Sequence, residues 1–346
     1  MINKTNFIYI EWIISFSCNY SCHYCFFKGN VKSHAYMFKN HGPRIPSDRI
    51  SKLFFKIAHY LGLFDYADSF LNHKIDKWIQ LFTEISKIKK QLYLSITGGE
   101  PLIYYKQINT IANELKNLYN KFLIRIDTNG SIIPQFSHDI KNLITYNVSY
   151  HPTQVKLDKF CNKLNSLKEQ GQILMINRVI NSDSELSKVV EELEFFSKMG
   201  YYLNVNLDHF DITKFSEKTL NYIKKIKSNV DYILPLFSKT IGNQCSYPTF
   251  GFQLLPNGYA WIPPCDMNKT INIIDKPINF LKILKNKPII CPAQCVCFHQ
   301  YPWALDGYKN FNIMAEYVIR NVGHRNQFFS SPCDYRQQLL LLEAKL

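Results

Sequence analysis

The stretch that decides the fold is residues 18–25, CNYSCHYC, which directly follows the apolar run 8–16. Cys18, Cys22 and Cys25 stand in it at C-x3-C-x2-C spacing. The apolar run is typical of a buried strand, so we expect the cysteines on a loop at its end. Closed iron–sulfur clusters take four cysteines. Three thiolates on one loop therefore favour a four-iron cluster with one iron left open to a small molecule.

Two other interpretations of the cysteine triplet are a zinc site and three buried cysteines with no shared role. Zinc sites favour paired C-x2-C elements with a second pair downstream, and the triplet has a different spacing. A second motif bears on the choice. Residues 97–101, TGGEP, follow the apolar run 92–96, and the two glycines permit close backbone approach.

The two motifs, in this order and with the aromatic Tyr24 before the last cysteine, resemble the radical S-adenosylmethionine (radical SAM) superfamily over about residues 8–297. The resemblance implies a 4Fe-4S cluster on the triplet that binds S-adenosylmethionine. It also implies reductive cleavage of that cofactor to a 5′-deoxyadenosyl radical, which abstracts hydrogen from a substrate C–H bond. The TGGEP residues implied to bind the methionyl amino group are Gly98, Gly99, Glu100 and Pro101.

Length and composition set wider limits. The chain has 346 residues, 46% of them hydrophobic, which suffices for a barrel-sized domain and a smaller one. We expect a cytoplasmic protein without a membrane segment, because no apolar run approaches the ~18 residues of a span. The ten cysteines fall mostly in two metal-like groups, which favours a reducing compartment. The net charge of +14 comes from scattered lysines, a pattern that disfavours nucleic acid as a partner.

Apolar strands alternate with amphipathic helices over residues 8–239, the pattern of a parallel sheet with covering helices. This predicts an α/β fold, a partial (β/α)6 TIM-like barrel with a small cysteine-rich C-terminal extension. Chemistry in such barrels lies at the C-terminal ends of the strands. The predicted strands are 9–17, 91–97, 122–127, 147–150, 173–180 and 202–207.

Polar residues at three further strand ends are candidates for cofactor contact. Asn129 follows the strand 122–127, and Ser149 matches a serine of the superfamily. His151 is a candidate proton relay, or alternatively a structural histidine held by the following proline. Of Asn177 and Arg178 only one can face inward, since side chains alternate along a strand, and we favour Asn177 for the ribose.

A second cysteine group begins near residue 245. Two short apolar runs, 250–255 and 259–262, flank Asn257-Gly258 and predict a β-hairpin. The group resembles the SPASM or twitch extension and implies a second, auxiliary 4Fe-4S cluster. A structural zinc site is the alternative. The five candidates for its four ligand places are Cys245, Cys265, Cys291, Cys295 and Cys297.

These expectations divide the chain into a radical SAM partial barrel (1–240), an auxiliary-cluster domain (241–307) and a helical tail (308–346). The expected function is that of an oxidoreductase-type enzyme that modifies a ribosomal peptide by oxidation, cross-linking or epimerisation. The alternative substrate is a small molecule such as a sugar or aminoglycoside. A remote alternative is a non-enzymatic metal-binding interaction protein. A flavodoxin or ferredoxin is the expected one-electron donor.

Overall fold

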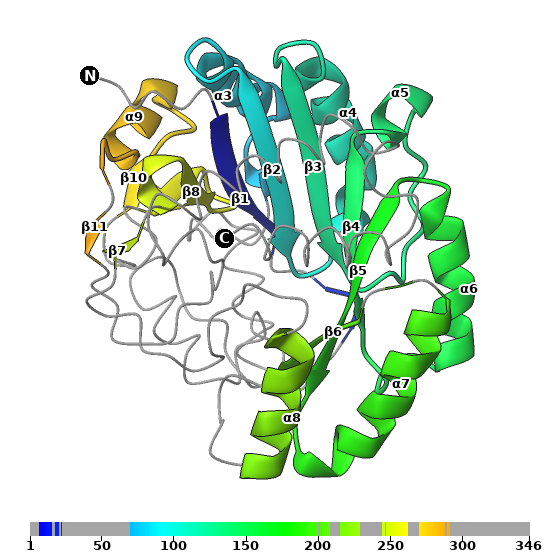
Figure 1. Cartoon of the computed structure of the whole chain (residues 1–346). Helices are drawn as coiled ribbons and strands as arrows, with labels where there is room; N and C mark the ends of the chain where they lie inside the picture. Colours follow the sequence, from blue (N-terminus) through cyan, green and yellow to red (C-terminus); the bar gives the residue numbers. More distant parts are fainter. Residues whose placement is uncertain are drawn as a thin grey trace, which may run out of the picture.

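A parallel sheet runs through the part of the chain that the computed structural model describes (Figure 1). The described residues are 7–15, 18–20, 22, 70–199, 201, 203–207, 215–228, 244–245, 247–261, 270–287 and 289–290. Within them nine strands form one sheet in the order β10-β9-β8-β1-β2-β3-β4-β5-β6. Strands β1 to β6 are parallel and lie side by side in chain order. They are Phe7–Ser15, Gln91–Gly98, Lys121–Thr128, Ile144–Tyr150, Gln172–Ile180 and Leu203–Leu207.

Helices follow the strands, as the alternation in the sequence predicts. They cover the outer face of the sheet, and the C-terminal ends of β1, β2 and β3 meet at one edge (Figure 1). The prediction of a partial (β/α)6 barrel is confirmed. The helices are α3 (Ile75–Ser86), α4 (Tyr105–Leu115), α5 (His138–Lys141), α6 (Leu157–Lys168), α7 (Leu186–Lys198) and α8 (Glu217–Ser228), with short 3-10 turns at Phe70–Asn72, Pro101–Tyr104 and Asp183–Glu185.

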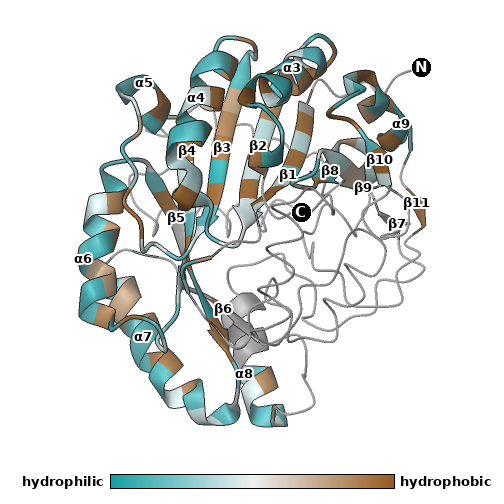
Figure 2. Ribbon diagram, turned by 180° about the vertical axis from the view of Figure 1, so that it is seen from behind, coloured by the Kyte–Doolittle hydropathy of each residue, from teal (hydrophilic) through white to brown (hydrophobic). Residues whose placement is uncertain are grey.

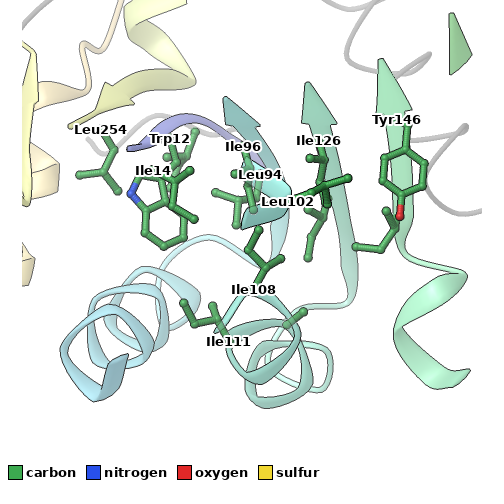
Figure 3. Close-up of a cluster of buried hydrophobic side chains, with 14 of the residues drawn as sticks. Trp12, Ile14, Leu94, Ile96, Leu102, Ile108, Ile111, Ile126, Tyr146 and Leu254 are labelled. Carbon is green, nitrogen blue, oxygen red and sulfur yellow. The ribbon is translucent and has the colours of Figure 1, made fainter. Parts of the chain in front are cut away.

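The core lies between the sheet and these helices. Figure 3 shows side chains of β1, β2 and β3 pointing toward α3 and α4. Trp12 is fully buried there, with its ring centroid 4.7 Å from that of Trp78 and 5.3 Å from that of Phe70. From the other side, α4 contributes Ile108 and Ile111. The outward residues of α6 and α7 are largely hydrophilic (Figure 2), so these helices are amphipathic in the sense that a surface helix requires.

The predicted hairpin is confirmed, and it joins the barrel sheet. β8 (Gly251–Leu254) pairs antiparallel with β9 (Tyr259–Trp261), and β9 pairs with β10 (Thr270–Asn272). Gly258 in the turn has φ +78°, and a Cβ there would overlap Ile274. On its other side β8 pairs in parallel with β1, so the sheet continues across the boundary predicted at residue 240.

A second, small sheet follows in the extension. It consists of β7 (Gln244–Cys245) and β11 (Ile289–Ile290), which are antiparallel. Between the two strands of this sheet, a 3-10 turn, Pro277–Asn279, continues into α9 (Phe280–Ile283). The predicted tail, 308–346, lies outside the described residues. In the segments that are described, no helix combines the length and hydropathy needed to cross a membrane.

Candidate active site

The loop after β1 carries the first cysteine of the triplet. Cys18 is half-buried, and its sulfur accepts hydrogen bonds from the backbone N–H of Tyr20 (3.4 Å) and from Asn129 Nδ2 (3.7 Å). Cys22 is buried. Hydrogen bonds to sulfur stabilise a thiolate and are found around cluster-ligating cysteines. The hydrogen bonds to Cys18 therefore fit a thiolate that ligates a cluster.

The glycine motif begins where β2 ends. Gly98 has φ +134°, and a Cβ at this position would overlap the carbonyl oxygen of Ser15 at the end of β1. The next residue, Gly99, donates its N–H to that same oxygen at 2.7 Å. Only glycine adopts this conformation and permits this approach. The motif thus fixes the end of β2 against the start of the cysteine loop.

Glu100 is fully buried and links β2 to β3. One carboxylate oxygen accepts hydrogen bonds from the N–H of Leu102 (2.9 Å) and the hydroxyl of Thr128 (2.7 Å). The other accepts from the N–H of Asn129 at 2.7 Å. Burial raises the pKa of Glu100, and these three hydrogen bonds oppose that shift. With both oxygens engaged, the carboxylate holds the two strand ends together.

Asn129 joins the two motifs. Its backbone donates to Glu100, while its side chain donates to Cys18 and, at 3.0 Å, to the side-chain oxygen of Asn19. Its own side-chain oxygen accepts from the N–H of Ser131 at 2.9 Å. Asn129 is 5% exposed, so these bonds form away from bulk water. A single residue at the end of β3 thus contacts both the cysteine loop and the glycine motif.

His151 follows β4 and lies beside the cysteine loop. Its ring centroid is 5.9 Å from that of Tyr20, and the two rings are nearly perpendicular. Burial, with a smaller contribution from Arg178, lowers the pKa of His151 to about 4. The imidazole is therefore neutral at pH 7, where it can accept a hydrogen bond but is a weak base. Burial also raises the pKa of Tyr20, and the nearby carboxylate of Glu100 adds to that shift.

Ser149 and Asn177 are neighbours across β4 and β5, and Asn204 of β6 continues the row. Alternation along β5 places Asn177 and Arg178 on opposite faces. Arg178 is 1% exposed and is held by Glu192 at 2.9 Å and Glu185 at 2.6 Å, both on the helix side. Arg178 thus forms ion pairs on the helix side of the sheet. Asn177 therefore lies on the interior face.

A comparison with solved structures agrees with the observed fold. The structure "Native anSMEcpe with bound AdoMet" (AdoMet is S-adenosylmethionine) superposes with a TM-score of 0.50 at 13% identity, covering 80% of this chain and 81% of that one. The chain shares the fold of that AdoMet-bound protein. "Native anSMEcpe with bound AdoMet and Kp18Cys peptide" gives 0.48 at 13% identity, over 80% and 81%. "Crystal structure of BtrN in complex with AdoMet and 2-DOIA" gives 0.34 at 16% identity, over 88% and 100%. No protein-family profile and no curated protein sequence matches the chain.

Several predicted site residues lie outside the description. Cys245 is placed only through its backbone in β7, opposite Ile289. In the residues that are described, no group of three or more potential metal ligands occurs, and of the triplet only Cys18 and Cys22 belong to those residues. The site residues that fall outside are Tyr24, Cys25, Cys265, Cys291, Cys295 and Cys297.

Three contributors to the site escaped the sequence-based prediction. Asn19 and Tyr20 lie inside the cysteine stretch, and Thr128 immediately precedes Asn129. Asn19 donates to the hydroxyl of Ser131 at 2.7 Å and so adds a second link between the cysteine loop and the segment after β3. The only indication in the sequence was that these residues lie within or beside a motif. Their contacts could not be predicted, because the partners lie about 30 to 130 residues away in the chain.

Proposed function

We propose that this chain is a radical SAM enzyme. The observation that carries the proposal is the position of Asn129, which contacts both the sulfur of Cys18 and the carboxylate of Glu100. The cysteine loop and the glycine motif, far apart in sequence, therefore meet at the C-terminal edge of a parallel sheet, where barrel enzymes carry their chemistry. The shared fold with an AdoMet-bound protein supports the same cofactor here.

The residues of this chain would bind and orient two groups. Cys18, Cys22 and Cys25 would hold a 4Fe-4S cluster. The backbone of Gly98 and Gly99 would accept hydrogen bonds from the methionyl amino group, since both carboxylate oxygens of Glu100 already have donors. When bound, the cluster and S-adenosylmethionine supply an adenosyl radical that abstracts a hydrogen atom from a substrate C–H bond.

Other residues would complete the cofactor pocket. Ser149 and Asn177, which are neighbours across β4 and β5, would hydrogen-bond a polar group such as the ribose. Pro101 begins the turn that Glu100 caps, and so fixes the exit of the chain from the motif. His151, neutral at pH 7, would accept a hydrogen bond near Tyr20 and could receive a proton only under acidic conditions. Tyr24 would pack beside Cys25.

For the extension we propose an auxiliary 4Fe-4S cluster on four of the five cysteines Cys245, Cys265, Cys291, Cys295 and Cys297. The pairing of β7 with β11 supports this, because Cys245 lies opposite Ile289, and Cys291 follows β11 directly in the sequence. The cluster would accept an electron from the product radical, which makes the overall reaction an oxidation. A flavodoxin or ferredoxin in the cytoplasm would supply the electron that starts each cycle.

For the substrate we propose a ribosomal peptide that is oxidised, cross-linked or epimerised. A small molecule such as a sugar or aminoglycoside is the second candidate. The feature that favours it is the interior face of the sheet, where Asp127 and Asn147 present polar atoms rather than an apolar surface. Turnover assays with each class, guided by the neighbouring genes, distinguish the two.

The central test is cleavage of S-adenosylmethionine. After anaerobic reconstitution we expect about eight irons per chain, and about four iron with one zinc would exclude the second cluster. The reduced protein should form 5′-deoxyadenosine, and Cys22→Ala should abolish this. Cys161→Ala is the matched control, because Cys161 is a similarly buried cysteine that packs in the core on α6. Cleavage by the Cys22 variant at the wild-type rate would refute the proposal.

A further inference from the structure

The side chain of Asn129, at the end of β3, has both of its donors engaged within the protein. An asparagine amide carries two N–H donors and one oxygen. The nitrogen of Asn129 lies 3.7 Å from the sulfur of Cys18 and 3.0 Å from the side-chain oxygen of Asn19. The oxygen accepts the backbone N–H of Ser131 at 2.9 Å. Each N–H group therefore has one acceptor, and neither remains for a direct contact with S-adenosylmethionine.

The orientation of this amide follows from its partners. The nitrogen and oxygen of an asparagine side chain are told apart by the hydrogen bonds around them. A backbone N–H group can only donate, so the atom of Asn129 that faces the N–H of Ser131 is the oxygen. The nitrogen then faces Cys18 on the other side of the amide. The sulfur of Cys18 thus receives a hydrogen-bond donor from Asn129, and not an acceptor.

The turn after β3 holds the amide in this position. The N–H of Gly130 donates to the hydroxyl of Thr128 at 3.0 Å, and Lys163 of α6 donates to the carbonyl oxygen of Ser131 at 2.8 Å. Asn129 itself is 5% exposed, so water competes little for its hydrogen bonds. A side chain that is fixed in this way by its neighbours can present a functional group with a defined geometry.

Two donors converge on the sulfur of Cys18. The backbone N–H of Tyr20 lies 3.4 Å from it and comes from the cysteine loop itself. The amide of Asn129 approaches from a strand end 111 positions away in the chain. Reduction of an iron–sulfur cluster adds one electron, and an N–H group directed at a ligand sulfur stabilises the added negative charge. Hydrogen bonds to the sulfurs are among the factors that set the reduction potential of such a cluster.

We propose that Asn129 is a positioning residue that raises the reduction potential of a cluster bound through Cys18. It acts through the sulfur of Cys18 and not by contact with S-adenosylmethionine. A higher potential makes the one-electron reduction that starts each cycle more favourable. The inference rests on the proposed function, because it requires that the cysteine triplet holds a 4Fe-4S cluster.

The first experiment is an anaerobic redox titration of the reconstituted full-length protein, followed by electron paramagnetic resonance. The signal that Cys22→Ala removes identifies the cluster on the triplet. Asn129→Leu keeps the approximate size of the side chain and removes both N–H donors. At a fixed potential we expect the ratio of reduced to oxidised cluster to be at least threefold lower in this variant than in the wild type, which is about 28 mV for a one-electron couple. An unchanged ratio would overturn the proposal.

Asn19→Leu is the matched control, because it is the same chemical change at the other end of the hydrogen bond between Asn129 and Asn19. It also breaks the 2.7 Å bond from Asn19 to the hydroxyl of Ser131, so it too weakens the link between the cysteine loop and the segment after β3. The donor from Asn129 to Cys18 remains in this variant. We expect it to titrate as the wild type does. Equal shifts in the two variants would show an effect of loop packing alone and overturn the proposal.

A second measurement does not depend on whether Asn129→Leu folds. The wild-type protein is labelled with ¹⁵N at its asparagine side-chain amides only, and the reduced cluster on the triplet is examined by pulsed electron paramagnetic resonance. We expect a coupling between the cluster and the label, and the same coupling in Asn19→Leu. Absence of the coupling from the wild type would overturn the proposal, because no asparagine amide would then donate to a ligand sulfur.

Cleavage of S-adenosylmethionine, measured on the same samples, separates this inference from the proposed function. Cleavage by the wild type, together with equal potentials for the wild type and Asn129→Leu, overturns the inference and leaves the proposed function in place. A lowered potential in Asn129→Leu, without cleavage by the wild type, supports the inference and contradicts the proposed function. Failure of the wild type to bind a cluster at the triplet would overturn both.

Discussion

The two faces of the same sheet differ in whether their buried side chains find matching partners. On the helix side, Trp12, Ile96 and Ile126 are buried among apolar side chains, so their contacts stabilise the fold (Figure 3). On the interior side, Ser95 and Asn147 are almost as deeply buried, yet each holds an oxygen without a partner in the described residues. Equal burial therefore has different energetic consequences on the two faces. The apolar contacts of the helix side stabilise the fold, whereas an unpartnered buried oxygen on the interior side costs stability.

The largest effect is expected on the helix side. Trp12→Ala should lower the free energy of unfolding by about 3–5 kcal/mol, because it removes a fully buried ring from among Phe70, Trp78 and Phe82. Urea denaturation measures this loss. Phe195→Ala, which truncates a 39% exposed aromatic on α7, is the control and should lose less than about 1 kcal/mol. Comparable losses in the two variants would contradict the assignment of the core.

The next effect concerns pH and His151. Its folded pKa of about 4 is below the ordinary 6.5, so the unfolded chain takes up the proton first as the pH falls. The stability is complete above pH 6.5 and declines between pH 6.5 and 4, by about 2–3 kcal/mol for this group. His151→Gln should remove this part of the decline, as seen by denaturation at pH 7 and pH 4.5. His138→Gln, at a 94% exposed histidine, should retain it; an identical pH profile for wild type and His151→Gln would refute the buried environment.

A smaller effect is expected at the boundary between the two faces. Glu100→Gln replaces one accepting oxygen by an amide NH2, so one of the hydrogen bonds from Leu102, Thr128 or Asn129 is lost. The free energy of unfolding should fall by about 1–3 kcal/mol. Glu114→Gln, on the exposed side of α4, is the control, and it should unfold at the wild-type urea concentration. A stable Glu100 variant would mean that this carboxylate does not hold β2 to β3.

The smallest effect is expected within the interior face and compares two hydroxyls of one row. Ser95→Ala should change the free energy of unfolding by less than about 0.5 kcal/mol or increase it, because Ser95 Oγ has no partner in the described residues. Thr145→Val should lower it by about 1 kcal/mol, since the Thr145 hydroxyl donates to the carbonyl oxygen of Ile124 at 3.1 Å. Chemical denaturation measures both, and a larger loss for Ser95→Ala would reverse the assignment.

Much of the fold followed from the sequence. The six strands of the barrel and the hairpin around Gly258 were predicted, because apolar periodicity and turn residues act locally. The placement of Gly98 and Cys18 at strand ends followed for the same reason. Alternation predicted that only one residue of the pair 177–178 faces inward, whereas the ion pairs of Arg178 in the structure show which one.

Other features depend on contacts between distant parts of the chain and could not be predicted. The low pKa of His151 arises from burial and from Arg178, 27 positions away. The hydrogen bonds of Glu100 come from residues at the end of β3. The motif TGGEP alone does not indicate that β3 lies beside it. The row of polar residues on the interior face, which includes Ser95 and Thr145, required the register between strands. A buried polar residue in an apolar run has no periodic signal of its own.

The pairing of β8 with β1 has a consequence for how the chain can be divided. β1 carries the cysteine loop, and its outer edge is covered by a strand that arrives more than 230 residues later. Truncation near residue 240 would leave the backbone donors and acceptors of β1 open, and exposed apolar edges of this kind recruit other chains. Contacts of such long sequence separation also form slowly. The extension thus covers the edge of β1, and it does so only after most of the chain has been synthesised. A chimera that exchanges the extension with that of a relative would therefore need a new β8 that pairs with this β1.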